Sequence, residues 1–286
     1  MTMHLATTSL LGLGLILVAC GDKSSDGDSG TSPDTDADTD TDTDTDTDTD
    51  STTDTDSGVP GAHVRGTVQY ADGTPAAGLQ VRLCYYSCKT FDSDASGGFE
   101  YLDVEAATHT LQAVRLGDTD WAIPNSLVTL GQGDDRTLDT PFTVVEYATK
   151  TDLSGQATIA GDGISIDADA SGYVPGVYSP DPDNTWVATV EIAPDLAGLP
   201  PDGMPGTPVA MWYLGNFDAE IDPPWGFTTS STYGLAAGTT VDIYTLDNIG
   251  KEWLAGGTAT VGADGITTDA GAGLPRLTTL ILVPQD

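Results

Sequence analysis

Short runs of alternating apolar and polar residues, separated by turns rich in glycine, proline and aspartate, recur from residue 61 onward. In the stretch HVRGTVQY, an extended backbone places Val64, Val68 and Tyr70 on one face and polar side chains on the other. The stretch TWVATVEIA alternates in the same way, LTTLILV is a further predicted strand, and no long segment has the 3.6-residue period of a helix. The sequence predicts an all-β fold with low helix content, arranged as two tandem β-sandwich domains at 61–148 and 149–286.

The charge of the chain excludes one class of partner. The 286 residues carry 44 acidic and 9 basic side chains, a formal net charge of -35. Neutralising nucleic-acid phosphates requires clustered lysine and arginine, and the four lysines of this chain lie far apart in the sequence. We therefore expect no nucleic-acid partner and no basic patch for a membrane surface.

The first twenty residues have the pattern of an export signal. Residues 10–19 (LLGLGLILVA) are apolar but too few to span a bilayer, and they have the length of a signal-peptide core. The stretch LVAC resembles the lipobox of bacterial lipoproteins. That resemblance implies removal of a signal peptide at 1–19 and lipidation of Cys20, which would attach the chain to a membrane. Gly21 rather than aspartate follows Cys20, which in a Gram-negative cell implies delivery to the outer membrane or cell surface. The alternatives are an ordinary cleaved signal and a free cysteine.

Residues 20–60 contain a low-complexity stretch, DTDADTDTDTDTDTDTDSTTDTD, at 34–56. Its strict alternation has no apolar face to bury, and its aspartates repel one another. The sequence predicts a disordered linker between the lipidated cysteine and the first domain. Weak calcium binding by the aspartates and glycosylation of the threonines are two further possibilities that the sequence leaves open.

The first predicted sandwich resembles a known domain family. The stretch VRGTVQYADGTPAAGLQVRL, followed by TFDSDASGGFEYLDV, resembles the carboxypeptidase regulatory-like domain, with matches at Gly66, Gly73, Pro75, Gly98 and Phe99, among others. That resemblance implies a transthyretin-like β-sandwich without catalytic residues of its own. Related folds bind carbohydrate, although no residue of this stretch marks such a site.

Cys84 and Cys88 are the two cysteines that remain after Cys20. Three residues separate them, and an exported protein is exposed to oxidising conditions. The sequence predicts a disulfide across a tight hairpin. The alternative, a metal pair, would need further ligands, and His63 and His109 are the histidines left to supply them.

The residues after Cys88 include a weak calcium motif. Asp92, Asp94, Ser96 and Asp103 match part of a D-x-D-x-S-G calcium loop. The competing interpretation is a plain hairpin turn, which is favoured because the glycines serve the turn and no helices flank it. No other metal site and no cofactor is predicted.

The second predicted domain has a fainter family likeness and several loop aromatics. The stretch GLAAGTTVDIYTLD, followed by EWLAGGTATVGADG, resembles β-sandwich modules of bacterial surface proteins that are distantly related to ZU5-type domains. That resemblance implies a structural or interaction unit. Tyr178, Trp225 and Phe227 lie in or near predicted loops, where they could stack on a sugar or anchor a partner, or else complete the core.

The sequence predicts a non-enzymatic protein. After signal cleavage only two histidines remain, and no nucleophile, zinc-protease or phosphate-loop motif is present. A hydrolase that uses two aspartates stays open, because aspartates are abundant. The leading hypothesis is a membrane-anchored surface lipoprotein whose head makes structural or adhesive contacts with a surface polysaccharide or protein. The alternative is a carbohydrate- or peptide-binding module accessory to a surface enzyme system.

Overall fold

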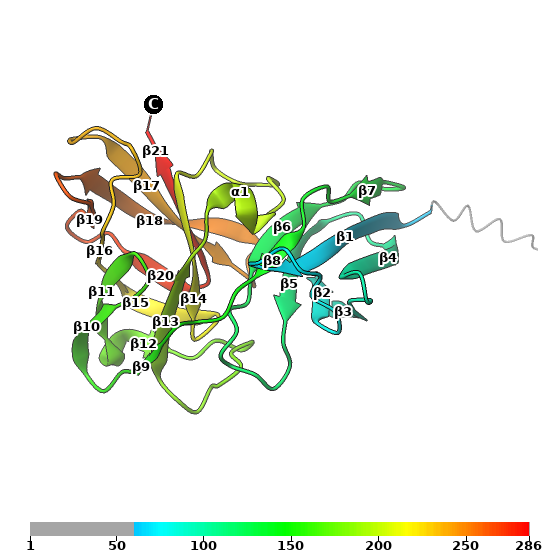
Figure 1. The fold of residues 1–286 in the computed structure, drawn as a ribbon, viewed down its shortest axis with the longest axis horizontal. Helices are drawn as coiled ribbons and strands as arrows, with labels where there is room; N and C mark the ends of the chain where they lie inside the picture. Colours follow the sequence, from blue (N-terminus) through cyan, green and yellow to red (C-terminus); the bar gives the residue numbers. More distant parts are fainter. Residues whose placement is uncertain (1–59, 286) are drawn as a thin grey trace, which may run out of the picture. The chain divides into compact units, whose positions relative to one another are not determined.

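The computed structural model describes residues 60–285 (Figure 1). The predicted signal peptide, the lipidated Cys20 and residues 20–59 lie outside that range. Strands form nearly all of the regular structure, with one short α-helix, α1 (Pro194–Ala197), and one 3-10 turn, η1 (Ala170–Gly172), in the described range. The prediction of an all-β fold with low helix content is confirmed.

Residues 62–144 form two four-stranded sheets (Figure 1). The strands of the first, in spatial order, are β4 (Gly98–Val104), β1 (Ala62–Tyr70) and β7 (Asp135–Thr137), with β8 (Phe142–Val144) pairing farther along β1. Those of the second are β3 (Cys88–Asp92), β2 (Gln80–Cys84), β5 (Thr108–Val114) and β6 (Asn125–Thr129). β7 and β8 both run parallel to β1, and the other pairs are antiparallel.

The core between these sheets follows from the alternation of their strands. Val64 and Val68 of β1 are buried, as are Val81 and Leu83 of β2, and all four belong to one apolar cluster. Each buried side chain of this size contributes roughly 1.5 to 3 kcal/mol relative to an exposed one. The intervening residues of β2 consequently point away from this core.

Residues 150–284 form a ten-stranded and a three-stranded sheet (Figure 1). The larger sheet has the order β10 (Gln156–Ala160), β11 (Ile164–Asp169), β16 (Phe227–Thr229), β19 (Ile266–Thr268), β18 (Glu252–Val261), β17 (Thr240–Asp247), β21 (Thr279–Pro284), β14 (Ala210–Gly215), β13 (Trp186–Glu191) and β9 (Lys150–Asp152). The smaller sheet has the order β12 (Tyr173–Val174), β15 (Ala219–Trp225) and β20 (Leu274–Leu277). Its inward residues, such as Ile221 and Leu277, pack in one cluster with Trp212 and Leu214 of β14.

Three neighbouring strands of the large sheet, β21, β14 and β13, are buried on both faces. Val187 of β13 faces the cluster shared with the three-stranded sheet, whereas Trp186 and Ala188 face a separate apolar cluster. This second cluster also contains Ala122 and Tyr147, which lie outside the strands of residues 150–284. The sheets of the two chain halves therefore share an apolar layer, which we call the shared core.

Hydrogen bonds reinforce the shared core. The Thr279 hydroxyl donates to the Asn125 carbonyl at 2.7 Å, and the Ser126 hydroxyl donates to the Pro200 carbonyl at 3.2 Å. Arg136 pairs with Asp202 at 2.6 Å. Residues 60–285 accordingly belong to a single compact unit. Within this range, no helix has the length and apolar character needed to cross a bilayer.

Candidate functional site

The candidate site begins with an outward-facing arginine on β2. Because Val81 and Leu83 point into the core, the alternation of the strand turns Arg82 to the opposite face of the sheet. There the Arg82 Nε–H donates to the Gln80 side-chain oxygen at 2.7 Å, which orients the guanidinium group.

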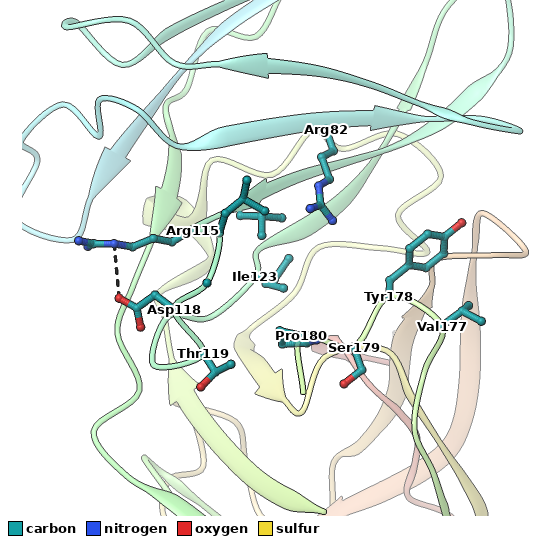
Figure 2. A pocket seen from close by; sticks show the side chains of 12 residues that line it. Arg82, Arg115, Asp118, Thr119, Ile123, Val177, Tyr178, Ser179 and Pro180 are labelled. Atoms are coloured by element: carbon teal, nitrogen blue, oxygen red, sulfur yellow. Dashed lines mark ion pairs between the residues drawn. The ribbon is translucent and has the colours of Figure 1, made fainter. Parts of the chain in front are cut away.

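A cavity of about 370 Å³ lies beside Arg82. It is bordered on one side by the segment that follows β5 and on the other by residues 177–180, as Figure 2 shows. In Figure 2 the Arg82 guanidinium extends from β2 toward the space bordered by Ile123, Tyr178 and Pro180. The volume falls in the range of small-molecule sites, roughly 300 to 1,000 Å³. We call this space the Arg82 cavity.

The charge of Arg82 has no counterion in the described structure. The chain has five arginines, and among residues 60–285 Arg82 is the one arginine without a carboxylate oxygen within 4.0 Å. Its partial burial lowers the pKa of the guanidinium below its ordinary value, although arginine stays charged at any physiological pH. A half-buried cation without a counterion is costly in free energy, and an anion that entered the cavity would offset that cost.

Arg115 stands at the rim of the same cavity. Its Nε lies 3.5 Å from the Asp118 carboxylate, and its guanidinium carbon lies 4.9 Å from the centre of the Trp121 ring. These contacts hold Arg115 in place, and its side chain remains largely exposed. The rim therefore presents a second cation, whose pairing with the partly exposed Asp118 carboxylate contributes at most about 1 kcal/mol.

The opposite wall of the cavity is an aromatic and aliphatic loop. Tyr178 is 41% exposed and Val177 is 79% exposed, and Leu116 on the facing segment is 60% exposed. Three apolar side chains gathered at one opening form a surface that a ring-shaped ligand can cover. The site thus combines a cation on its floor with an amphipathic wall.

Buried polar contacts hold this loop. The Ser179 hydroxyl donates to the Asn216 side-chain oxygen at 2.6 Å, and the Asn216 amide donates to the carbonyls of Asp181 (2.6 Å) and Asn184 (3.2 Å). Asn216 is fully buried. A Cβ at Gly176 would lie 2.1 Å from the Asp218 carbonyl oxygen, so this position requires glycine. The wall of the cavity is consequently preorganised.

Asp218 is a buried acid in contact with that loop. Its side chain is fully buried with Oδ1 3.4 Å from Arg276, which also contacts Glu220 at 2.8 Å and Asp247 at 3.4 Å. Burial raises the pKa of Asp218 to about 6, and the charge of Arg276 opposes this shift. Oδ2 of Asp218 has no hydrogen-bond partner in the structure, which is consistent with a carboxyl group that readily takes up a proton.

Replacing Asp218 with asparagine should remove a pH dependence of stability. The folded-state pKa of about 6 exceeds the ordinary 3.8, so the folded state binds more protons than the unfolded state between these values. The free energy of unfolding should therefore fall as pH rises from about 4 to about 6, by roughly 3 kcal/mol from this residue, and the contribution should be constant above pH 6. Asp218→Asn should be more stable than wild type at pH 7.5, with the difference shrinking toward pH 4.

Urea denaturation at a series of pH values between 4 and 7.5 measures this difference. Glu220→Gln is the matched control, because Glu220 belongs to the same charge cluster but is about half exposed. The control should show no such trend. A difference between Asp218→Asn and wild type that does not vary with pH would contradict the assignment.

The structure separates the three aromatic residues that the sequence suggested for ligand binding. Tyr178 lines the Arg82 cavity. Trp225 and Phe227 are 3% and 1% exposed and belong to the core, where Trp225 stacks on Tyr173 at a centroid distance of 6.3 Å. The suggestion of a surface role is wrong for Trp225 and Phe227, because β15 and β16 turn both side chains inward.

The two cysteines of the first sandwich form the predicted disulfide, Cys84–Cys88, between paired positions of β2 and β3. His63 lies in β1, where its Nε2 is 2.8 Å from the Glu100 carboxylate. His109 lies in β5.

The proposed calcium loop is a hairpin turn in this structure. Oδ1 of Asp94 accepts hydrogen bonds from the Ser96 amide (2.8 Å), the Ser96 hydroxyl (2.7 Å) and the Gly98 amide (2.8 Å). Asp92 ends β3 and Asp103 lies near the end of β4. Among the residues of the described range, no group of three or more His, Cys, Asp or Glu side chains is arranged to hold a metal ion. The presence of an aspartate at position 94 is thus explained by the hydrogen bonds with which it closes the turn.

Sequence reasoning did not single out Arg82 or Arg115. The sequence did contain a feature that could have identified Arg82 as a site residue. It is a basic residue at an outward position of a strand in a strongly acidic chain. No signal in the local sequence indicated that residues 177–180 would lie opposite it, since a distant asparagine, Asn216, fixes that loop.

Comparisons with known proteins add little to this geometry. No protein-family model and no curated protein matches the chain. Among solved structures, a DUF3823 family protein from Bacteroides ovatus shares 12% identity, with 74% of this chain and 84% of that chain covered and a TM-score of 0.24. A candidate carbohydrate binding protein from Bacteroides uniformis shares 10%, with 79% and 100% covered and a TM-score of 0.25.

The major pilin subunit BcpA of Bacillus cereus shares 10% identity, with 79% of this chain and 59% of that chain covered and a TM-score of 0.25. Such identities and TM-scores carry no argument about function. The class of the protein is defined by its own strands, as an all-β protein of packed sheets with a preorganised cavity beside an arginine.

Proposed function

We propose that this chain is a non-catalytic binding protein of the cell surface, whose Arg82 cavity takes a saccharide that carries a carboxylate. The observation that carries the proposal is Arg82 itself, a half-buried guanidinium without a counterion, directed into a cavity. The guanidinium fork matches the two oxygens of a carboxylate, and such charge-assisted pairs are among the stronger hydrogen bonds.

A sugar ring suits the rest of the cavity. One face of a pyranose presents C–H groups that can cover the ring of Tyr178, while its hydroxyl groups can bond to the polar rim at Asp118 and Thr119. An aliphatic carboxylate would leave this polar rim unused. The cavity therefore favours an acidic sugar, which refines the alternative of a carbohydrate-binding module that the sequence left open.

The negative charge of the protein bears on how such a ligand reaches the site. A net charge of -35 repels anions at long range, but this repulsion is screened over roughly 8 Å at physiological ionic strength. The contact with a partly buried guanidinium is screened less. Recognition would then depend on the local geometry of Arg82 rather than on attraction by the whole surface.

The proposal includes attachment of this protein to a membrane through a lipid on Cys20. Support comes from the sequence, in which LVAC-G precedes an Asp- and Thr-rich stretch of about forty residues before the first strand. A head held on a lipidated Cys20 could make adhesive contacts with an acidic polysaccharide. Intact-mass analysis of the membrane fraction should show the acylated Cys20 species, and a Cys20→Ala protein that stayed in the membrane fraction would refute the anchor.

The binding activity is tested on an array of acidic and neutral oligosaccharides. We expect saturable binding of the full-length protein to uronic-acid or sialylated glycans, and loss of that binding in Tyr178→Ala. The matched control is Phe91→Ala, which removes a partly exposed aromatic side chain that does not line the Arg82 cavity. If no acidic glycan binds, or if Tyr178→Ala binds as well as the wild type, the proposal fails.

A further inference from the structure

The tip of the β2–β3 hairpin presents two tyrosines on a closed ring of backbone. The Cys84–Cys88 disulfide joins the ends of the two strands, and Tyr85, Tyr86 and Ser87 connect them. The ring centroids of Tyr85 and Tyr86 lie 4.2 Å apart. Tyr86 is 86% exposed, the highest exposure among the large apolar and aromatic side chains of the described range. The disulfide limits the freedom of the tip, so this aromatic surface loses little entropy on binding.

A second cavity lies beside this tip. Its volume is about 190 Å³, and its wall includes Tyr85, Tyr86, Lys89, Glu105 and His109. None of its lining residues belongs to the Arg82 cavity. The two cavities are thus separate sites, and we call this one the tip cavity.

His109 belongs to the wall of the tip cavity and has a buried ring nitrogen without a hydrogen-bond partner. Its side chain is 3% exposed, and Nε2 lies 2.9 Å from the Glu105 carbonyl oxygen. Burial lowers the pKa of His109, so the ring is neutral at physiological pH. Nε2 then carries the proton that bonds to the Glu105 carbonyl, and Nδ1 is an acceptor without a partner in the structure. A buried acceptor of this kind is satisfied by a donor such as a hydroxyl group.

Charged groups of both signs surround the tyrosines. The Lys251 ammonium, from the turn between β17 and β18, lies 5.1 Å from the centre of the Tyr85 ring. The Lys89 ammonium donates to the carbonyls of Leu102 and Asp103. The Glu105 carboxylate belongs to the same wall. The tip cavity therefore offers both donors and acceptors around an aromatic surface, rather than a single sign of charge.

We propose that the tip cavity is a second saccharide site, which takes a neutral sugar residue. The apolar face of the ring stacks on Tyr86, hydroxyl groups donate to Glu105 and to Nδ1 of His109, and a ring or hydroxyl oxygen accepts from Lys89. A neutral pyranose matches this mixture of donors and acceptors, because each of its hydroxyl groups can both donate and accept. This site stands independently of whether the Arg82 cavity binds an acidic sugar.

Saturation-transfer NMR and titration calorimetry test this site with cellohexaose, xylohexaose and mannohexaose as probes. We expect the full-length protein to bind at least one of them, Tyr86→Ala to weaken that binding at least tenfold, and Tyr86→Trp to retain it. Tyr86→Ala should keep the wild-type melting temperature, because the side chain is almost fully exposed. The matched control is Leu196→Ala, which removes an exposed apolar side chain that lines neither cavity and should leave the binding of the neutral hexasaccharides unchanged.

Two results would overturn the proposal. One is the absence of saturable binding for all three hexasaccharides. The other is a change of less than threefold in Tyr86→Ala. Neither result bears on the Arg82 cavity, whose ligands carry a carboxylate and whose binding is tested by Tyr178→Ala.

Discussion

Trp186→Ala should lower the free energy of unfolding of the folded unit, residues 60–285, by about 4 kcal/mol, because it empties the centre of the shared core. The Trp186 side chain is 3% exposed, and its ring meets Tyr147 edge-on at a centroid distance of 6.2 Å. Its indole N–H donates to the Asp181 carboxylate at 3.0 Å, and the Lys150 ammonium lies 4.8 Å from its ring. Gly215 also lies against the ring, since a Cβ there would approach it to 2.6 Å. Truncation removes all of these contacts at once.

Chemical denaturation followed by far-UV circular dichroism measures the effect. The wild type should unfold in a single transition, because the sheets on both sides share this core. Leu102→Ala, at a side chain that is 62% exposed, should change the stability by less than about 0.5 kcal/mol. A loss below 1 kcal/mol in Trp186→Ala, or two separate transitions in the wild type, would contradict the role given to the shared core.

Arg82→Gln should weaken the binding of a carboxylate-bearing oligosaccharide about 30-fold, which corresponds to about 2 kcal/mol. Glutamine keeps a polar side chain but removes the charge that pairs with the carboxylate. Because Arg82 has no ion pair within the described structure, we expect the melting temperature to stay within about 2 °C of the wild type. Arg82→Lys should recover part of the affinity, since it restores the charge without the planar fork.

Isothermal titration calorimetry gives the affinities of these variants. Arg65→Gln is the matched control, because Arg65 lies on β1 and pairs with Asp135 at 2.6 Å, away from the residues that line the cavity. The control should bind as the wild type does. An Arg82→Gln protein that binds within threefold of the wild type would show that the guanidinium does not recognise the ligand.

The strands could be predicted from the sequence because burial on one face leaves a two-residue period. Val64 and Val68 of β1 and Val81 and Leu83 of β2 show this period, and the structure buries all four. Strand β13, which lies next to the edge strand β9, is different, since Trp186, Val187 and Ala188 are consecutive buried residues. This run indicates that both faces are covered. It does not indicate that Tyr147 and Ala122 would cover one of them.

The aromatic residues show where the local sequence pattern was sufficient to predict the position of a side chain and where it was not. In the stretch WGFTT the alternating positions Trp225, Phe227 and Thr229 are all buried, so the strand pattern would have placed both aromatics in the core. Tyr178 lies in a loop with no such pattern. Its place beside the Arg82 cavity depends on contacts with Asn216, 38 positions later in the sequence, which no local rule predicts.

The division into two sandwich domains at 61–148 and 149–286 remains a proposal. Strands of residues 62–144 pair with one another, and strands of residues 150–284 pair with one another. The shared core and the hydrogen bonds of Asn125 and Ser126 nevertheless join the two sets. The Arg82 cavity lies where residues 82 and 115–119 of the first set face residues 177–180 of the second. Its geometry therefore depends on that association.

The most direct test of a carboxylate site compares one acidic oligosaccharide with its carboxyl-reduced form, in which each carboxylate is a neutral primary alcohol. The affinities of the wild type and of Arg82→Gln for both ligands form a double-mutant cycle. We predict that reduction of the carboxyl groups weakens binding to the wild type about 30-fold and hardly changes binding to Arg82→Gln. Equal losses in the two proteins, or equal affinity of the wild type for the two ligands, would contradict recognition of a carboxylate by Arg82.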